Sequence, residues 1–244
     1  MPSGRRRKLD AIVARLQLQY GPEAIRRAAP APASFALLST TFAELDAALA
    51  GGLPRGRITE IAGPATSGKV TLAAKTLTAA QAERDALVAW LDLPRTCDPD
   101  YMHRCGLDLD RLLVVRPHDA LDALAITLHL VTSRTLAALV FDGTAQLAQA
   151  DSAAVTGSLE RLATVVTQTQ TAVIFLTEPQ APSRTLAHVA AVRLALRREE
   201  WLTRGSDVRG YTGQVEILKH RQGKAGAVVP LRIAFNGTVH GSGL

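Results

Sequence analysis

Short apolar runs alternate with longer segments of helical periodicity over most of the chain. The apolar runs predict buried strands at 58–62, 87–92, 112–115, 138–142 and 172–177. Apolar residues recurring every three or four positions predict helices at 41–50, 69–84, 98–105, 120–133 and 152–170. Strands that alternate with helices in this way predict an α/β fold whose mostly parallel, twisted sheet is covered by helices on both faces.

The two ends of the chain depart from this alternation. Three final strands, predicted at 189–197, 213–219 and 228–235, are joined by polar or glycine-containing connections and indicate an antiparallel C-terminal edge. At the other end, the periodicity predicts a helix over 5–28, interrupted by Gly21, before an Ala/Pro-rich linker. We therefore expect an N-terminal helix and linker over 1–34 and one core over 35–244.

Composition narrows the class of protein. The chain has 244 residues, of which 47% are hydrophobic, so it can bury a substantial core. We expect neither a signal peptide nor a transmembrane segment, because no apolar run reaches the roughly 18 residues that a spanning helix needs. The spacing of Cys97 and Cys105 fits neither a disulfide framework nor a metal motif, which favours the reducing cytoplasm.

The charge balance favours a polyanionic partner without demanding one. The formal net charge is +6, and the C-terminal third is rich in arginine. Arginines there are either solvated surface charges or a track for a DNA backbone. The candidate DNA-binding residues are Arg184, Arg193, Arg197 and Arg198.

The segment after the first predicted strand of the core carries the clearest chemistry. It follows the phosphate-binding pattern G-x-x-x-x-G-K-[Ser/Thr] except at its last position. Glycines allow the backbone to approach an anion, N–H groups at a helix N-terminus face it, and a lysine adds positive charge. The residues expected to bind a nucleotide are Gly63, Pro64, Ala65, Thr66, Ser67, Gly68, Lys69, Val70 and Thr71.

The last position of the pattern weakens the expected Mg²⁺ site. Val70 has no hydroxyl to offer Mg²⁺, and Thr71 is rotated by about 100° around the helix. Thr71 would therefore need a shifted loop or an intervening water to serve. Asp142, at the end of a later apolar strand, is expected to approach Mg²⁺ through water.

Several segments in order resemble the RecA recombinase family along nearly the whole chain. They lie at 9–25, 39–58, 98–110, 192–198 and 219–221. The resemblance implies that Tyr101 stacks on adenine and that Asp98 accepts a hydrogen bond from its amino group. It also implies that Lys219 and Arg221 reach the phosphates of a neighbouring subunit in a homo-oligomer.

The chain also departs from the family pattern. Pro94 stands where the family has its catalytic glutamate, so a contribution of about 10²–10⁴-fold from general base catalysis is expected to be lost. Glu178 replaces the glutamine that senses the γ-phosphate, and it is either a substitute base or a repulsive charge. The first DNA-binding loop has no basic residue between 143 and 159, the second is shortened to about 178–184, and His188 replaces an aromatic. We expect no counterpart of the family's C-terminal domain.

These losses make the chain similar to ImuA proteins, which accompany translesion synthesis. The resemblance implies ATP and Mg²⁺ as ligands, single-stranded DNA, an ImuB-like Y-family polymerase homologue, an error-prone replicative-type polymerase and RecA as partners, and a bacterial, nucleoid-associated location. Hydrolysis would be slow, with Lys69, Asp142 and Glu178 as the candidate catalytic residues. Two alternatives stay open: a non-catalytic module that binds a polymerase or RecA, and a recombinase paralogue in mixed filaments.

Overall fold

The computed structural model describes residues 4–21, 36–179, 183–235 and 239–241, which fall into two compact units. The first unit, Met1–Phe35, contains helix α1 (Gly4–Tyr20). Gly21, with φ of +91°, ends this helix. The rest of the predicted helix and the predicted linker at 29–34 lie outside the described residues.

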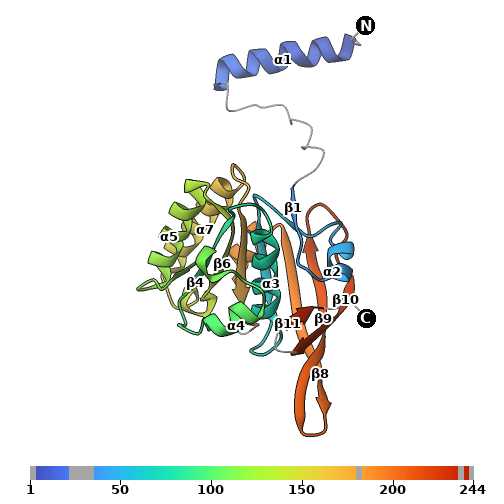
Figure 1. Cartoon of the computed structure of the whole chain (residues 1–244). Coiled ribbons are helices and arrows are strands. Elements are labelled where there is room, and N and C mark those ends of the chain that lie inside the picture. Colours follow the sequence, from blue (N-terminus) through green and yellow to red (C-terminus); the bar gives the residue numbers. More distant parts are fainter. Residues whose placement is uncertain (1–3, 22–35, 180–182, 236–238, 242–244) are drawn as a thin grey trace. The chain divides into compact units, whose positions relative to one another are not determined.

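The second unit, Ala36–Leu244, is built on a nine-stranded sheet in the order β11-β10-β9-β8-β3-β7-β6-β4-β5 (Figure 1). The strands from β8 to β5 in that order pair in parallel, and the pairs β8–β9, β9–β10 and β10–β11 are antiparallel. The predicted mostly parallel sheet with an antiparallel C-terminal edge is confirmed. Its strands are β3 (Ile58–Ala62), β4 (Leu87–Asp92), β5 (Leu112–Val115), β6 (Leu136–Asp142), β7 (Ala172–Thr177), β8 (Val192–Arg204), β9 (Asp207–His220), β10 (Val228–Phe235) and β11 (Val239–Gly241).

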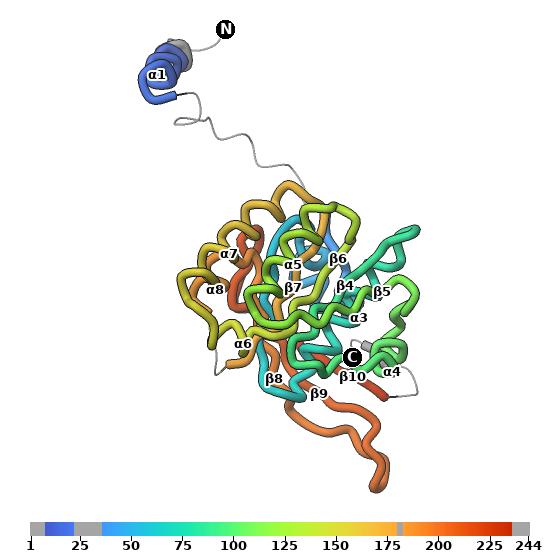
Figure 2. The backbone as a smooth tube through the Cα atoms, turned by 90° about the vertical axis from the view of Figure 1, so that its left-hand side faces the viewer, coloured from blue at the N-terminus to red at the C-terminus, as the bar shows by residue number. Residues whose placement is uncertain are grey.

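Helices cover both faces of this sheet. One face carries α2, α3 and α4, and the other carries α5, α7 and α8 (Figures 1 and 2). A separate ribbon of two short strands, β1 and β2, precedes the main sheet. The bounds are β1 (Leu37–Leu38), β2 (Leu53–Pro54), α2 (Ala43–Ala48), α3 (Lys69–Gln81), α4 (Pro99–Arg104), a 3₁₀ turn (Leu109–Arg111), α5 (Ala120–Ser133), α6 (Thr144–Leu147), α7 (Ser152–Val166) and α8 (Arg184–Val189).

Alternation along the central strands divides the core into two layers. In β4, Val88 and Trp90 pack on the α3 side, while Ala89 and Leu91 pack on the α5 and α7 side. Successive side chains of a strand point to opposite faces, so a strand that is apolar at every position is buried on both. The continuous apolar runs of the sequence are therefore the central parallel strands.

None of the described helices is long and apolar enough to cross a membrane.

The structure differs from the predicted elements mainly after residue 178. Strands β8 and β9 extend to Arg204 and Asp207, whereas the predicted strands stop at 197 and resume at 213. The extra length forms a hairpin whose side chains are largely exposed, so it lacks the apolar alternation on which the prediction depends (Figure 1). The short helices α6 and α8 were also not predicted, and α8 includes Val189, which the prediction assigned to a strand.

Candidate nucleotide-binding site

The phosphate loop connects β3 to the N-terminus of α3. Gly68 caps α3 with φ of +96°, a conformation that glycine adopts without strain. Gly63 is needed for a different reason: a Cβ atom there would lie 2.4 Å from Ser67 Oγ and 2.9 Å from the carbonyl oxygen of Leu196. Ser67 Oγ is buried and has no hydrogen-bond partner in the described part of the chain. The loop therefore has the backbone shape, and an unused polar atom, of an anion cradle.

A cavity of about 460 Å³ opens beside this loop, at the carboxyl ends of the parallel strands. This is the edge at which open α/β sheets bind ligands. Loop residues that line it are Ala65, Thr66, Gly68, Lys69, Val70 and Thr71. It is also lined by Pro94, Tyr101, Asp142 and Glu178, which come from four separate segments of the chain. Gly63, Pro64, Ser67 and Asp98 were expected at the site and do not line the cavity.

Lys69 is buried, and the protein itself holds its ammonium group. Lys69 Nζ donates to the carbonyl oxygen of Gly63 at 2.8 Å and forms an ion pair with Glu178. The side chain of Glu178 retains 35% of its exposure. The carboxylate of Glu178 thus occupies a position next to the ammonium group of Lys69, which is expected to bind phosphate. A phosphate group that enters the site must displace this carboxylate or bind beside it.

Two aspartates end neighbouring strands at the cavity. Asp142 is paired in register with Asp92, which is fully buried and accepts hydrogen bonds from Thr96 N at 2.8 Å and Arg116 Nε at 3.2 Å. Burial raises the pKa of Asp142 to about 6, and the charges of Asp92 and Glu178 raise it too, while Lys69 opposes them. Asp142 lines the cavity, whereas Asp92 is held inside the protein by its own partners.

Pro94 is the residue that the family resemblance predicts in the place of the catalytic base. Pro94 follows β4 and lines the same cavity as Lys69 and Asp142. Proline carries no group that accepts a proton. Among the candidates in the cavity, only the carboxylates of Asp142 and Glu178 could do so, and Glu178 is paired with Lys69.

The hydroxyl of Thr71 has a partner within the protein. Thr71 is buried, and its Oγ1 lies 2.6 Å from the hydroxyl of Tyr101. Tyr211, on β9, also lines the cavity and was not among the residues expected there. Val70 packs against the hydrophobic core. No group of three or more His, Cys, Asp or Glu side chains that could hold a metal ion occurs among the described residues. These donors do not fit the Mg²⁺ site of a phosphate loop, in which a hydroxyl and a carboxylate share the ion.

Of the two residues expected to contact adenine, Tyr101 lines the cavity and Asp98 does not. Tyr101 lines the cavity, with the guanidinium carbon of Arg104 at 5.8 Å from its ring centroid. Asp98 was expected to accept from the adenine amino group. In the structure its Oδ1 accepts from Asp100 N at 2.9 Å and caps α4, because a carboxylate before a helix satisfies its free N–H groups.

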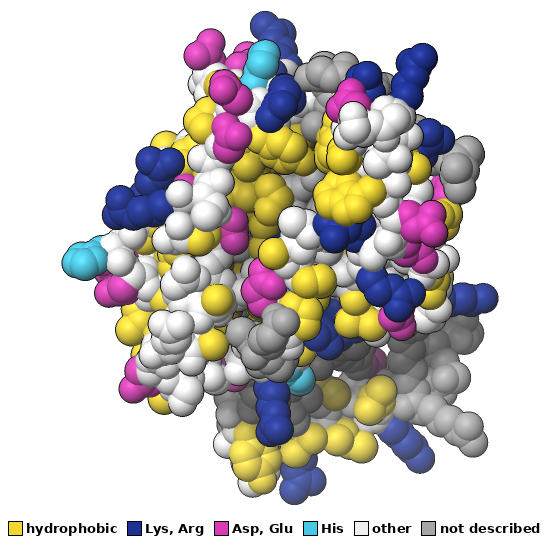
Figure 3. All heavy atoms as spheres, turned by 90° about the horizontal axis from the view of Figure 1, so that it is seen from below, with side chains coloured by type: hydrophobic (Ala, Val, Ile, Leu, Met, Phe, Trp, Pro, Cys, Tyr) yellow, Lys and Arg dark blue, Asp and Glu magenta, His cyan; other side chains and the backbone are white. Residues whose placement is uncertain are grey.

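The four candidate DNA-binding arginines differ in their exposure and in their bonding partners. Arg184 is exposed at the start of α8, and Arg197 is exposed and donates to Gln214 Oε1 at 3.3 Å. Arg198 donates to Thr66 Oγ1 of the phosphate loop at 2.7 Å and lies 4.2 Å from the ring centroid of Trp201. Arg193 forms an ion pair with the buried Glu60. On the face seen in Figure 3, Lys and Arg side chains alternate with acidic and hydrophobic ones and form no continuous basic track.

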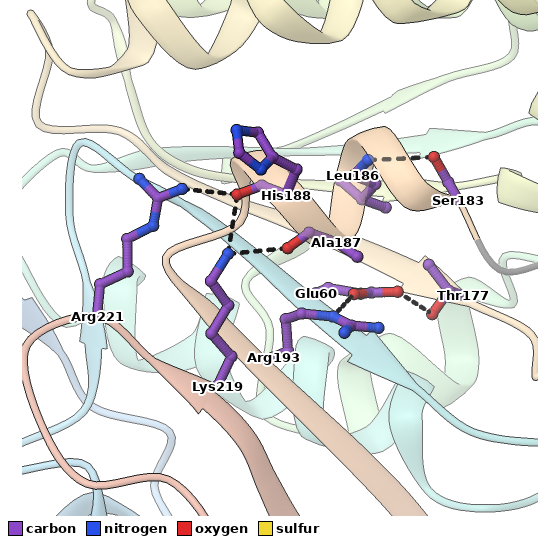
Figure 4. Close-up of polar contacts among 9 residues, drawn as sticks. All are labelled: Glu60, Thr177, Ser183, Leu186, Ala187, His188, Arg193, Lys219 and Arg221. Carbon is purple, nitrogen blue, oxygen red and sulfur yellow. Dashed lines mark hydrogen bonds and ion pairs between the residues drawn. The ribbon is translucent and has the colours of Figure 1, made fainter.

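Lys219 and Arg221 both lie at the C-terminus of α8 (Figure 4). Lys219 Nζ donates to the carbonyl oxygens of Ala187 and His188, each at 2.8 Å, and Arg221 Nη2 donates to that of His188 at 2.6 Å. Cations stabilise a helix end because its last carbonyl groups have no partner within the helix. Within this chain, both side chains hold α8 in place.

Comparisons with known proteins agree with this architecture. The family described as RecA N-terminal domain matches residues 7–244. Protein RecA of Streptomyces avermitilis is 31% identical over 246 residues, which cover 89% of this chain and 65% of that protein. Protein RecA of Salinispora tropica is also 31% identical, over 98% of this chain and 76% of that protein.

The similarity to a solved structure concerns the fold. The crystal structure of the RadB recombinase superposes with a TM-score of 0.66 at 21% identity, covering 85% of this chain and all of that one.

The chain spans only about two thirds of the length of the Streptomyces relative, and the activity of that whole protein does not transfer with the match. The family match over nearly the whole chain, together with a phosphate loop placed on this sheet, shows that the protein belongs to the RecA recombinase family.

Proposed function

We propose that this protein is a RecA-like accessory factor of DNA repair that binds ATP in the loop from Gly63 to Thr71. It would act in the bacterial cytoplasm, at the nucleoid, in error-prone translesion synthesis, as ImuA proteins do. One observation carries the proposal. The phosphate loop and its lysine open into a cavity, while Pro94 lines that cavity where a recombinase would have its base.

Hydrolysis in such a site would be slow. Proton transfer from water needs a positioned base, and a general base typically contributes 10²–10⁴-fold to a rate. Glu178 is the candidate replacement, but its ion pair with Lys69 must first open. A protein that binds ATP and hydrolyses it slowly is suited to a binding or signalling role.

The first experiment measures phosphate release from ATP with and without single-stranded DNA. Lys69→Ala should abolish it, because among the described residues its ammonium is the only cationic group that lines the cavity. Lys75→Ala is the matched control: Lys75 is on the same helix, donates to the carbonyl oxygen of Cys105 and does not line the cavity. Equal rates for Lys69→Ala and the parent would remove the loop from the mechanism.

Partners follow from the same proposal. We expect binding to single-stranded DNA, an ImuB-like Y-family polymerase homologue, an error-prone replicative-type polymerase and RecA. Co-purification of the full chain with each partner, in ATP and without nucleotide, tests this set. Binding to none of them would contradict the proposed role in translesion synthesis.

A non-catalytic interaction module is the second candidate, and the Lys69–Glu178 ion pair favours it. In this hypothesis the loop keeps its shape but is closed by the protein's own carboxylate. Titration calorimetry with a slowly hydrolysed ATP analogue separates the two candidates. Micromolar affinity supports ATP binding, and no heat at millimolar analogue supports the module.

A role in mixed filaments depends on Lys219 and Arg221 reaching a neighbouring subunit's nucleotide. Both side chains would first have to leave the carbonyl groups at the end of α8. Strand exchange catalysed by the protein alone would favour this third candidate over the other two.

A further inference from the structure

Three hydroxyl groups lie beside the first turn of α3. Thr71 Oγ1 lies 2.6 Å from the hydroxyl of Tyr101, and the hydroxyl of Tyr211 approaches Gly68. All three residues line the cavity. Tyr101 comes from α4 and Tyr211 from β9, so two distant segments converge on the first turn of α3.

The Tyr211 hydroxyl stands over the N-terminus of α3. A Cβ atom on Gly68 would lie 2.7 Å from this hydroxyl, which leaves room only for glycine. The ring is held by edge-on contacts with Trp201 and Phe235, at centroid distances of 5.7 and 5.8 Å. A side chain fixed in this way loses little conformational entropy when a ligand arrives.

The hydroxyl of Tyr211 is a hydrogen-bond donor beside the cavity. The Tyr101 hydroxyl and Thr71 Oγ1 share one hydrogen bond, whereas the hydroxyl of Tyr211 lies next to Gly68 of the phosphate loop. Burial raises the pKa of both tyrosines, which keeps their phenols protonated. A protonated phenol of Tyr211 at the cavity can donate to a phosphate oxygen, which is a strong acceptor.

The same residues leave few oxygen ligands for Mg²⁺. The position that supplies the hydroxyl ligand in a phosphate loop is Val70, and the neighbouring hydroxyl of Thr71 is hydrogen-bonded to Tyr101. Of the nearby carboxylates, Asp92 is paired with Arg116 and Glu178 with Lys69. Asp142 is left, and Mg²⁺ demands near-octahedral oxygen coordination.

From these contacts we infer that the site binds nucleotide phosphates without a divalent cation. Lys69, the N–H groups of the loop and the hydroxyls of Tyr101 and Tyr211 act in its place. The inference deepens the proposed function and rests on nucleotide binding in this loop. It makes Tyr211 a nucleotide-contacting residue.

Calorimetric titration of the full chain with ADP tests the inference. The dissociation constant should differ by less than about threefold between buffer with MgCl₂ and buffer with EDTA. Tyr211→Phe should weaken binding about tenfold in both buffers, because a hydrogen bond to a charged group contributes about 1.5 kcal/mol. Tyr20→Phe, which alters an exposed tyrosine on α1, is the matched control and should leave affinity unchanged.

Val70→Thr adds the missing hydroxyl and should create a Mg²⁺ dependence of tenfold or more. Binding by the parent that requires Mg²⁺ overturns the inference and leaves the proposed function intact. Metal-independent binding that Tyr211→Phe does not weaken overturns the role of the tyrosine. A folded parent that binds no ADP or ATP in either buffer contradicts the proposed function and the inference with it.

Discussion

The nucleotide cavity and the α8 cluster (Glu60, Arg193, Lys219, Arg221 and the last carbonyl groups of α8) are both rich in charge, yet they differ in what faces the charges. In the cavity, Lys69, Asp142 and Glu178 line open space of about 460 Å³. In the α8 cluster, the charged groups form hydrogen bonds and ion pairs with the protein itself (Figure 4). Charges beside a cavity can act on a ligand, whereas charges with internal partners stabilise the fold.

The largest expected effect tests the structural role of the α8 cluster. Arg193→Ala leaves the carboxylate of Glu60, which is 2% exposed, without its ion pair. A buried charge that loses its partner typically costs about 3–5 kcal/mol of unfolding free energy, and the partial exposure of Arg193 places the expected cost near 3 kcal/mol. Urea denaturation measures it.

Arg197→Ala is the control for this change. Arg197 is exposed and its hydrogen bond to Gln214 is long, at 3.3 Å, so its loss should change stability by less than about 0.5 kcal/mol. If Arg193→Ala were as stable as the parent but bound DNA more weakly, Arg193 would belong to a DNA interface after all.

The second prediction concerns Asp142 in the cavity. Its folded pKa of about 6 lies above its ordinary value, so the folded state holds a proton that the unfolded state releases. The contribution of Asp142 to the free energy of unfolding is fully present below about pH 4 and is lost as the pH rises to about 6. Asp142→Asn should therefore be more stable than the parent at pH 7, by on the order of 2–3 kcal/mol, and equal to it near pH 4.

Thermal unfolding across this pH range measures the difference between Asp142→Asn and the parent. A parent whose stability rises, relative to the variant, between pH 4 and pH 6 would contradict the sign. In that case Asp142 would have a favourable partner that the cavity does not show.

The third prediction sharpens the role of Glu178. Glu178→Gln removes the negative charge beside Lys69, so ATP should bind about tenfold more tightly, a change of about 1.4 kcal/mol. Glu160→Gln, on α7 and outside the cavity, should leave the affinity unchanged. Weaker ATP binding by Glu178→Gln would instead show that the carboxylate orients Lys69 for the nucleotide.

The smallest effect is expected at the end of α8. Lys219→Met removes two hydrogen bonds to helix carbonyl groups and should cost about 1 kcal/mol. Hydrogen exchange should become faster in α8 but not in β3. Lys224→Met, in the exposed turn before β10, is the control. Unchanged stability together with lost self-association would assign Lys219 to a neighbouring subunit.

Much of the central fold was predictable because its signals are local. The strands β3, β4, β5 and β7 and the helix α5 lie where the apolar pattern predicts them. The hairpin at 198–212 was missed because its side chains are mostly in solvent, and α8 because a six-residue helix barely samples one period. Tyr211 was missed for a different reason: it stands between Gly210 and Thr212 in a polar stretch. An aromatic that directly follows a glycine in a polar stretch was the one signal available.

The sequence by itself determined the family, the sheet and the place of the phosphate loop, since these depend on residue types at short spacing. Tertiary structure decided what each charged or hydroxyl group has as a partner. Arg193 and Lys219 look free in the sequence and are bonded in the fold, while Thr71 looks like a substitute metal ligand and is bonded to a tyrosine. Partners are decided by distances between segments far apart in the chain, which β-sheet pairing sets and local spacing does not contain.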